Sequence, residues 1–179
     1  IKGIYPLFKS PLKSTKRVQL MGSGTILREV EAAVELLKDD WDVAADVWSI
    51  TSSNELRRDG LACERWNMLH PNETPRVPYI TEQLQEAQGP FIAATDYMKL
   101  YSDQLRPYIP GNFKVLGTDG YGRSDTRAKL RHFFEVNRYF VVIAALGSLV
   151  EEGTIKADVV AEAIKKYGIS PEKVDPVTV

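Results

Sequence analysis

The chain has 179 residues and a mass of 20.1 kDa, a size at which one domain can bury a core without disulfides or metals. Its 44% hydrophobic and 26% charged residues exclude a disordered or fibrous protein. The 23 Lys and Arg residues against 24 Asp and Glu residues leave a net charge of −1, which argues against a general nucleic-acid binder. No apolar run reaches the roughly 20 residues that span a bilayer, and no secretion signal is visible.

The chain contains a single cysteine, Cys63, which excludes an internal disulfide and any multi-cysteine metal site. Because no secretion signal is visible, a reducing cytoplasm is the expected location. The first residue is Ile1 rather than Met. We therefore expect the chain to be processed or cut from a longer protein, to which part of its function belongs.

Short apolar segments alternate with segments of helical periodicity along most of the chain. Residues 1–8 are apolar-rich, and residues 9–17 carry the cations, prolines and serines that are typical of a turn or linker. The elements expected next are strand Val18–Met21, helix Thr25–Lys38, strand Ala44–Ile50, helix Asn54–Leu69, short helix Val77–Gln88, strand Phe91–Thr95, helix Asp96–Arg106 and strand Phe113–Gly117.

Three further helices are expected before the end of the chain. The first is predicted to be capped by Ser124 or Asp125. The apolar run Tyr139–Leu146 fits either a helix or a strand by periodicity, but Asn137 before it and Gly153 after it favour a helix. The last helix ends at Gly168 and is expected to bury Val159, Val160, Ala163, Ile164 and Tyr167.

This alternation predicts an α/β fold, a three-layer α/β/α sandwich with a largely parallel sheet. Ligands of such sheets bind beyond the carboxyl ends of the strands, in the loops that lead into helices. Four loops of this chain are expected there: Gly22–Thr25, Thr51–Asn54, Thr95–Lys99 and Thr118–Asp125.

The first of these loops contains Gly22-Ser23-Gly24, whose free backbone N–H groups can hold a phosphate. The dinucleotide-binding fingerprint requires a third glycine three positions after the second, and this chain has Leu27 there. The pattern therefore favours a tight structural turn over an anion site, and both interpretations stay open.

The richest of the four loops is Thr118–Asp125. Gly120 and Gly122 allow a sharp turn and a close approach of the backbone. Arg123 can bind a carboxylate or phosphate through two parallel hydrogen bonds. Alternatively, Arg123 pairs with a neighbouring acid and holds the loop against another domain or subunit, which is the favoured interpretation.

No catalytic motif is present, and the remaining polar residues have structural explanations. Cys63 and His70 would lie about two turns, roughly 10 Å, apart on one helix, too far for proton transfer, so Cys63 is expected to be buried and inert. His132 is expected on a helix face, and two histidines without a carboxylate cluster argue against a metal site. The cationic patches Arg57–Arg58 and Arg127–Arg131 are expected to be solvated or to contact proteins.

Six longer segments point to one family. They are Val18–Arg28, Cys63–Pro71, Thr74–Ile80, Thr95–Leu100, Leu116–Asp125 and His132–Val136. Together they resemble the C-terminal domain of the homodimeric bacterial pyruvate dehydrogenases, the thiamine-dependent, acetyl-transferring first components within the transketolase superfamily. The likeness covers nearly the whole chain without a large gap.

The resemblance implies a transketolase C-terminal-like fold, a five-stranded mixed sheet whose first strand, in the region Ile1–Phe8, runs antiparallel to the others. Residues 1–17 would form that strand and a linker, and residues 18–179 the α/β domain, all within one domain of a larger chain. The parent reaction that it implies is decarboxylation of pyruvate and reductive acetylation of a lipoyl group in the pyruvate dehydrogenase complex.

The resemblance also implies which residues this chain does not contain. In the family, thiamine diphosphate and Mg²⁺ lie between the first two domains, on a Gly-Asp-Gly motif followed by paired asparagines. Here Asp119-Gly120 lacks the first glycine, and Asn-Asn does not occur. The family's catalytic histidines and activating glutamate also lie in other domains. We therefore assign no catalytic, cofactor-binding or metal-binding residue, and expect the isolated chain to bind no cofactor and to be inactive.

The implied role of the domain is assembly. Its implied partners are the other domains of the parent, the second subunit of a homodimer and the dihydrolipoyl acetyltransferase core, with no nucleic acid and no membrane. The segments Thr118–Asp125 and Trp66–Pro78 are the contact candidates, with Asp119, Tyr121, Arg123, Ser124, Asp125, Trp66 and His70 as their key side chains. The alternative is a stand-alone flavodoxin-like module that binds an anion or nucleotide at Gly22–Thr25 and Thr118–Asp125.

Overall fold

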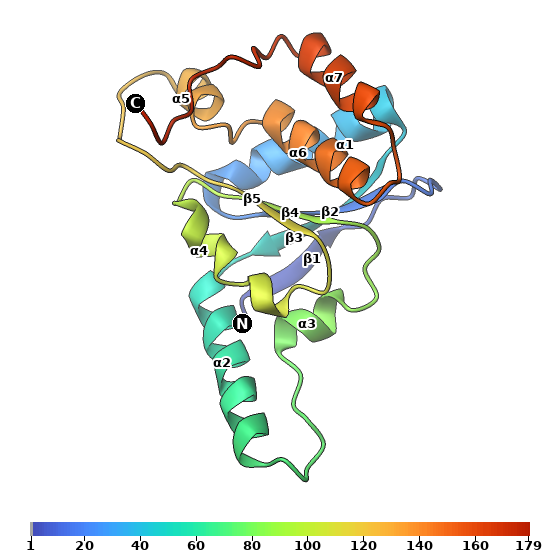
Figure 1. Ribbon diagram of the computed structural model, residues 1–179, viewed down its shortest axis with the longest axis vertical. Coiled ribbons are helices and arrows are strands. Elements are labelled where there is room, and N and C mark those ends of the chain that lie inside the picture. Colours follow the sequence, from blue (N-terminus) through green and yellow to red (C-terminus); the bar gives the residue numbers. More distant parts are fainter. Residues whose placement is uncertain (1) are drawn as a thin grey trace.

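A sheet lies between two layers of helices in the computed structural model, which describes residues 2–179 (Figure 1). The strands are β1 (Ile4–Phe8), β2 (Arg17–Gly22), β3 (Ala44–Ile50), β4 (Phe91–Ala94) and β5 (Phe113–Leu116). They lie in the order β1-β3-β2-β4-β5, with β1 antiparallel to β3 and every other pair parallel. The predicted sandwich with an antiparallel first strand is confirmed. Ile1, the start of the predicted first segment, lies outside the described residues.

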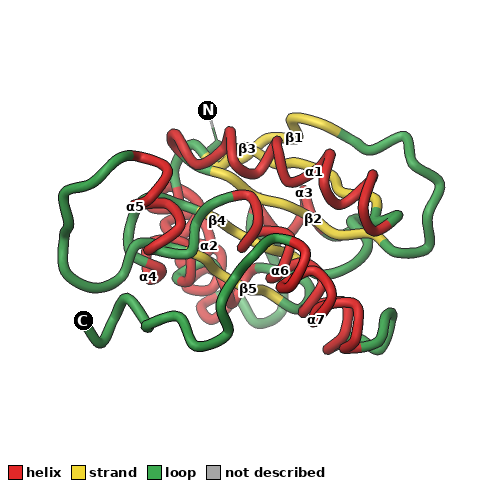
Figure 2. Tube along the Cα trace, turned by 90° about the horizontal axis from the view of Figure 1, so that it is seen from above, coloured by secondary structure: helices red, strands yellow, loops and turns green. Residues whose placement is uncertain are grey.

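The helices divide between the two faces of the sheet. The upper layer in Figure 1 contains α1 (Leu27–Trp41), α5 (Arg127–Phe133), α6 (Arg138–Glu151) and α7 (Ala157–Lys166). The lower layer contains α2 (Ser53–Leu69), α3 (Tyr79–Leu84) and α4 (Lys99–Asp103). Two short 3₁₀ turns, η1 (Gly24–Ile26) and η2 (Arg106–Tyr108), precede α1 and follow α4. Seen from above, α5 lies to one side of the other helices of its layer (Figure 2).

Each face of the sheet has its own hydrophobic core, because side chains of a strand point alternately to opposite faces. In β2, Val18 and Leu20 join the upper core, whereas Met21 joins the lower one. Helix α6 supplies the centre of the upper core, and Leu56 of α2 and Ile80 of α3 are buried in the lower core. Of the residues predicted to be buried by α7, Ala163 is fully buried and the others are partly buried.

Several elements are shorter than predicted. The expected helix Val77–Gln88 reduces to α3, with Pro78 as its N-cap residue, and the expected helix Asp96–Arg106 divides into α4 and η2. The predicted cap of α5 was wrong by one residue. Thr126, whose backbone is extended, accepts the N–H of Lys129 on its hydroxyl (3.4 Å), whereas Asp125 accepts the N–H of Thr126 itself (2.7 Å).

The segment Arg127–Glu151 is long and apolar enough, by composition, to cross a membrane. It is two helices, however, because Glu135 between α5 and α6 has a φ of 61°. α6 has 14 residues and is therefore about 21 Å long, shorter than the roughly 30 Å of a hydrocarbon core. Seven of its residues are buried against the sheet and α1, which accounts for its apolar sequence.

The edge strand β1 has a proline at its centre. The carbonyl of Gly3 accepts the N–H of Thr51 (2.8 Å), and Tyr5 lies opposite Ser49. In an antiparallel pair, alternate residues turn their backbone polar groups toward the partner. Gly3 and Tyr5 therefore face β3, and Pro6, which has no N–H to donate, faces outward from the sheet.

A buried carboxylate joins three helices of the upper layer. Glu29 in the first turn of α1 accepts hydrogen bonds from Nη1 of Arg131 on α5 (2.8 Å) and from both the backbone N–H and Nε of Arg138 on α6 (3.0 Å each). Burial alone would raise the pKa of Glu29, but the hydrogen bonds and charges of the two arginines outweigh it and hold this pKa below its usual value. The carboxylate fixes where α5 lies relative to the sheet.

Helix α2 packs closely on η2 through a glycine. A Cβ placed on Gly60 would lie 2.4 Å from Cζ of Tyr108, so no larger residue fits while the buried ring keeps its place. Gly147 in α6 differs, because a Cβ there would meet no atom within 4 Å. A side chain therefore has no room at Gly60 but has room at Gly147.

Alanine at these two glycines is expected to have opposite effects on stability. Gly147→Ala should stabilise the chain by about 0.5–1 kcal/mol, because alanine loses less backbone entropy in a helix. Gly60→Ala should destabilise it by about 1–3 kcal/mol, because the Tyr108 ring must shift. Urea unfolding of both variants measures this. A gain in stability for Gly60→Ala would contradict the packing described.

Removal of the Glu29 carboxylate is expected to cost about 2–3 kcal/mol of unfolding free energy at neutral pH, since it leaves two arginines without their partner. The folded-state pKa is lowered, so the stabilisation is complete above the unfolded-state value of about 4.3 and is lost as the pH falls through the folded-state value. The difference in unfolding free energy between the unsubstituted chain and the Glu29→Gln variant should therefore shrink as the pH falls. Urea unfolding across pH 3–7 measures this.

The matched control is Glu35→Gln on the same helix, where an exposed carboxylate lies 3.6 Å from Lys38. An exposed pair of this kind contributes little, so the control should change stability by less than about 0.5 kcal/mol. Equal losses in the two variants, or a gap that does not vary with pH, would show that Glu29 does not hold the helices together.

Candidate functional site

The carboxyl ends of β2, β4 and β5 open into a cleft of about 560 Å³. Its walls are the turn after β2, the loop between β5 and α5, and α5 itself, which lie beside one another in Figure 2. The polar side chains that line it include Thr25, Asp96, Thr118, Arg123, Arg127 and Arg131. This is the edge of the sheet at which parallel α/β folds bind ligands.

Hydrogen bonds join three of the four predicted loops at this edge. The hydroxyl of Ser23 donates to that of Thr95 (2.8 Å), and the hydroxyl of Thr25 donates to Asp96 (3.3 Å). The hydroxyl of Thr118 donates to the backbone carbonyl of Asp96 (2.8 Å). The fourth loop does not line the cleft. The side chain of its Asn54 accepts a hydrogen bond from Gln104 (3.1 Å).

The candidate residues of the loop Thr118–Asp125 differ in their surroundings. Asp119 anchors the loop by accepting the N–H of Lys99 (2.9 Å), and Asp125 lies 3.6 Å from the ammonium of Lys129. Ser124 lines a smaller hollow beside the main cleft, and Tyr121 is 80% exposed. The loop is therefore held at both ends, and its central residue Tyr121 is exposed to solvent.

Arg123 forms no ion pair with an acid among residues 2–179, and the neighbouring Asp125 lies beside Lys129 instead. Its guanidinium lies over the ring of Phe133, 4.1 Å from the ring centre. A cation held over an aromatic face keeps its charge and its outward N–H groups available. Arg123 thus lines the cleft as an oriented cation without a carboxylate partner in the described chain.

The C-terminal segment completes the outer wall of this loop, a feature that no sequence pattern indicated. The carbonyl oxygen of Pro176 lies 2.2 Å from the position of a Cβ on Gly120, whose φ is 105°. Lys173 is largely buried and donates to the carbonyl of Phe133 (2.7 Å) and to Glu135 (3.1 Å). Gly120 is therefore needed for this close approach as well as for its backbone conformation.

Trp66 and His70 lie far from the cleft, at the end of α2 that projects below the sheet (Figure 1). The two rings are stacked, with centres 4.4 Å apart and planes 9° apart. The guanidinium of Arg76 lies 4.1 Å from the Trp66 ring centre, and the side chain of Asn67 bonds both the N–H and the carbonyl of Arg76. We call residues 66–78 the α2 tip; its local contacts give it a fixed shape.

The remaining candidates are structural. Cys63 is buried, and burial followed by the nearby charge of Asp59 raises the pKa of its thiol, which keeps it protonated and unreactive. His132 packs against Phe140, with ring centres 5.6 Å apart. Arg131, predicted within a solvated patch, is instead the partner of Glu29 and is 15% exposed in its side chain. That pairing joins residues about a hundred positions apart, which no local pattern shows.

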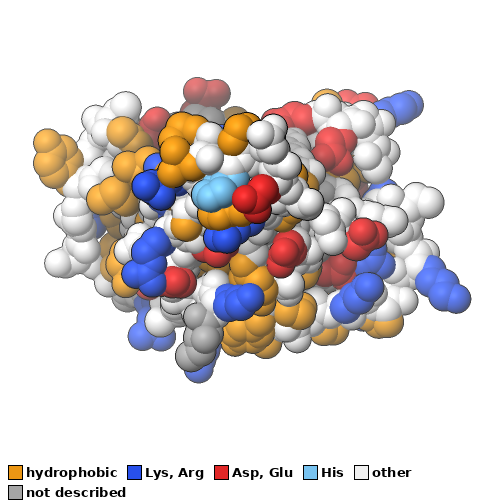
Figure 3. Space-filling view, turned by 90° about the horizontal axis from the view of Figure 1, so that it is seen from below, with side chains coloured by type: hydrophobic (Ala, Val, Ile, Leu, Met, Phe, Trp, Pro, Cys, Tyr) orange, Lys and Arg blue, Asp and Glu red, His pale blue; other side chains and the backbone are white. Residues whose placement is uncertain are grey.

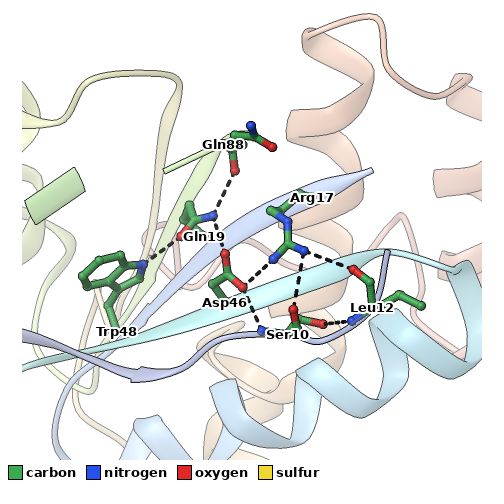
Figure 4. A network of polar contacts seen from close by, with 7 residues as sticks. All are labelled: Ser10, Leu12, Arg17, Gln19, Asp46, Trp48 and Gln88. Atoms are coloured by element: carbon green, nitrogen blue, oxygen red, sulfur yellow. Dashed lines mark hydrogen bonds and ion pairs between the residues drawn. The ribbon is translucent and has the colours of Figure 1, made fainter. Parts of the chain in front are cut away.

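A second hollow, of about 530 Å³, lies over the lower face of β1, β2 and β3. Its floor is the network drawn in Figure 4. Gln19 donates to Asp46 (3.0 Å) and to the carbonyl of Gln88 (2.9 Å), and accepts the indole N–H of Trp48 (2.8 Å). Asp46 also accepts from Arg17 and from the N–H of Ser10. The network satisfies its own polar groups and holds the segment after β1 against the sheet.

Comparisons with known proteins agree with this geometry. Residues 3–137 match the family described as the transketolase-like TK C-terminal domain. The chain is 59% identical over 98% of its length to the pyruvate dehydrogenase E1 component of Pseudomonas aeruginosa, and 55% identical over 98% to that of Escherichia coli K12. It spans only 20% of the length of each of these relatives.

Solved structures show the same fold at much lower identity. A split-gene transketolase, an inactive beta4 tetramer, matches 82% of this chain and 42% of its own with a TM-score of 0.56 and 15% identity. The transketolase of Campylobacter jejuni matches 82% of this chain and 18% of its own with a TM-score of 0.55 and 17% identity. The resemblance drawn from the sequence is confirmed, and the chain belongs to the transketolase-like C-terminal domain family.

Proposed function

We propose that this chain is the C-terminal domain of a pyruvate dehydrogenase first component. The observation that carries the proposal is its identity of 59% and 55%, over 98% of its length, to two proteins named pyruvate dehydrogenase E1 component. The parent would be an oxidoreductase acting on 2-oxo acids, which decarboxylates pyruvate and reductively acetylates lipoyl groups of a multienzyme complex in the cytoplasm.

Thiamine diphosphate and Mg²⁺ belong to this proposal as cofactors of the parent. Within residues 2–179, no three His, Cys, Asp or Glu side chains come together as a metal site. The carboxylates near the cleft already have other contacts, since Asp96 accepts from Thr25 and Asp125 from Thr126. These residues do not fit the cofactor, so we assign none of them to holding it.

The role of the domain in the parent is assembly. Exposed apolar side chains occur in two places: Tyr97, Met98, Leu100 and Tyr121 follow the carboxyl ends of β4 and β5, and Met68 and Leu69 lie at the end of α2. Large apolar surface on a folded domain marks contacts with other protein surfaces. The view from below, onto the end reached by α2, shows apolar side chains interspersed with basic and acidic ones and a histidine (Figure 3).

The α2 tip suits such a contact because its shape is set in advance. The stack of Arg76, Trp66 and His70 fixes side chains that would otherwise lose conformational freedom on binding. Next to this stack, Met68 is 72% exposed. The surfaces that it would meet are those of the other domains or of the second subunit of a homodimer; the acetyltransferase core is the further partner of the assembled enzyme.

The isolated chain is expected to release no CO₂ from pyruvate when thiamine diphosphate and Mg²⁺ are supplied, whereas the full-length parent should. Release of labelled CO₂ from [1-¹⁴C]pyruvate measures this. Turnover by the isolated chain above the level of a protein-free control would contradict an assembly role.

The substitution Met68→Asp in the full-length parent is expected to weaken assembly at least tenfold, because it places a charge in an apolar contact. Sedimentation at decreasing protein concentration measures the effect. The control is Lys165→Glu near the end of α7, on the opposite side of the sheet. Since Met68 is exposed, unfolding of the isolated domain should be unchanged. Equal assembly of the two variants would show that the α2 tip is not part of the interface.

A further inference from the structure

The hollow over the lower face of β1, β2 and β3 has the size of a small-molecule site. Its volume of about 530 Å³ lies within the roughly 300–1,000 Å³ of pockets that hold small ligands. It lies over the start of β2, away from the cleft at the carboxyl edge, and shares no lining residue with that cleft. Its lining combines apolar side chains with a few polar ones, as such pockets do.

One wall of this hollow, residues 83–88, is held against β2 by the glycine that follows it. Gly89 has a φ of 83°, and a Cβ there would lie 1.8 Å from the carbonyl oxygen of Arg17. The carbonyl of Gln88 accepts a hydrogen bond from the side chain of Gln19 (2.9 Å), which is part of the floor drawn in Figure 4. The wall and the floor are therefore joined to each other before any ligand is present.

The opposite wall is shaped by a shift in the register of β1. Pro6 lies opposite Trp48 on β3, whereas Phe8 lies opposite Val47, so that Leu7 is an extra residue on β1. A bulge of this kind turns a side chain away from its regular direction, and Phe8 lines the hollow together with Pro6 and Trp48. Phe8 is 43% exposed and Trp48 is half-buried. The hollow therefore offers two aromatic side chains to an apolar ligand.

Two charges of opposite sign also line this hollow without an ion pair among residues 2–179. On the floor, Arg17 and Asp46 pair with each other. Lys9, after β1, and Glu86, after α3, are exposed and have no such partner within the described chain. Because β3 lies between β1 and β2, the two walls face each other across it. A ligand with a single charge is attracted by one wall and repelled by the other, whereas a zwitterion is attracted by both.

We propose that this hollow binds a small zwitterion that carries a flat apolar ring, the chemical class of the aromatic amino acids. The ring would pack against Phe8 and Trp48, the carboxylate would lie toward Lys9, and the ammonium group toward Glu86. This site goes beyond the function proposed above and does not rest on it, because it uses neither the α2 tip nor any residue outside this chain.

Titration of the 179-residue chain with three compounds, followed by amide and indole chemical shifts, tests the proposal. L-Phenylalanine should bind saturably and about fivefold more tightly than phenethylamine, which lacks the carboxylate, or 3-phenylpropionate, which lacks the ammonium group. The shifts should change in residues 6–9 and 83–88 and at the indole of Trp48. Absence of saturable binding of L-phenylalanine, equal affinity for the three compounds, or shifts confined to other residues would overturn the proposal.

Two exposed residues, each with a matched control, separate the two charges. Lys9→Gln should weaken binding of L-phenylalanine about fivefold and should not weaken that of phenethylamine, since the amine has no carboxylate for Lys9 to attract. The control Lys13→Gln removes an exposed cation from the same segment, outside the hollow, and should leave both affinities unchanged. Equal effects of Lys9→Gln and Lys13→Gln would contradict the role of Lys9.

Glu86→Gln should show the converse pattern. It should weaken binding of L-phenylalanine about fivefold and should not weaken that of 3-phenylpropionate, which has no ammonium group. Its control is Glu82→Gln on α3, an exposed carboxylate outside the hollow. Phe8→Ala should weaken binding of all three compounds, because each carries the ring. Unchanged affinities in Phe8→Ala, or equal effects of Glu86→Gln and Glu82→Gln, would overturn the assignment.

Discussion

The position of α5 depends on one buried carboxylate. Glu29 is the point at which α1, α5 and α6 meet, and it holds two guanidinium groups that come from different helices. α5 has only seven residues and none is buried, so apolar packing alone gives it little hold on the sheet. The ion pair with Arg131 replaces that packing. What α5 carries, including one wall of the cleft and the ring under Arg123, is therefore positioned by a charge in α1, together with the contacts of Lys173 with the Phe133 carbonyl and of His132 with Phe140.

The layers and most strands follow from the sequence because they are set by local patterns. β3 occupies the predicted Ala44–Ile50, a β-rich and mostly apolar segment of the kind expected for a strand covered on both faces. Asn137 likewise caps α6 through hydrogen bonds to the N–H groups of Tyr139 and Phe140, as its position before the apolar run indicates. The antiparallel direction of β1 came from the family resemblance, because five apolar residues do not fix the direction of a strand.

The candidate site is only partly predictable from the sequence. The loop Thr118–Asp125 lies at the expected edge because the ends of parallel strands converge there. What the sequence does not show is which side chains face one another across long separations. Arg131 with Glu29 and the C-terminal segment with Gly120 are both contacts of this kind. A helix face whose charges pair with a distant residue has the same local sequence pattern as a helix face whose charges meet only solvent.

Pro6 has a consequence for how the domain meets other proteins. An edge strand with exposed apolar side chains, such as those of Tyr5 and Phe8, is the usual starting point for sheet extension between molecules. The missing donor at the middle of β1 interrupts any ladder that a foreign strand could build there. A foreign strand could therefore pair with this margin over only a short length. Contacts through side chains are the larger share of what this surface offers to a partner.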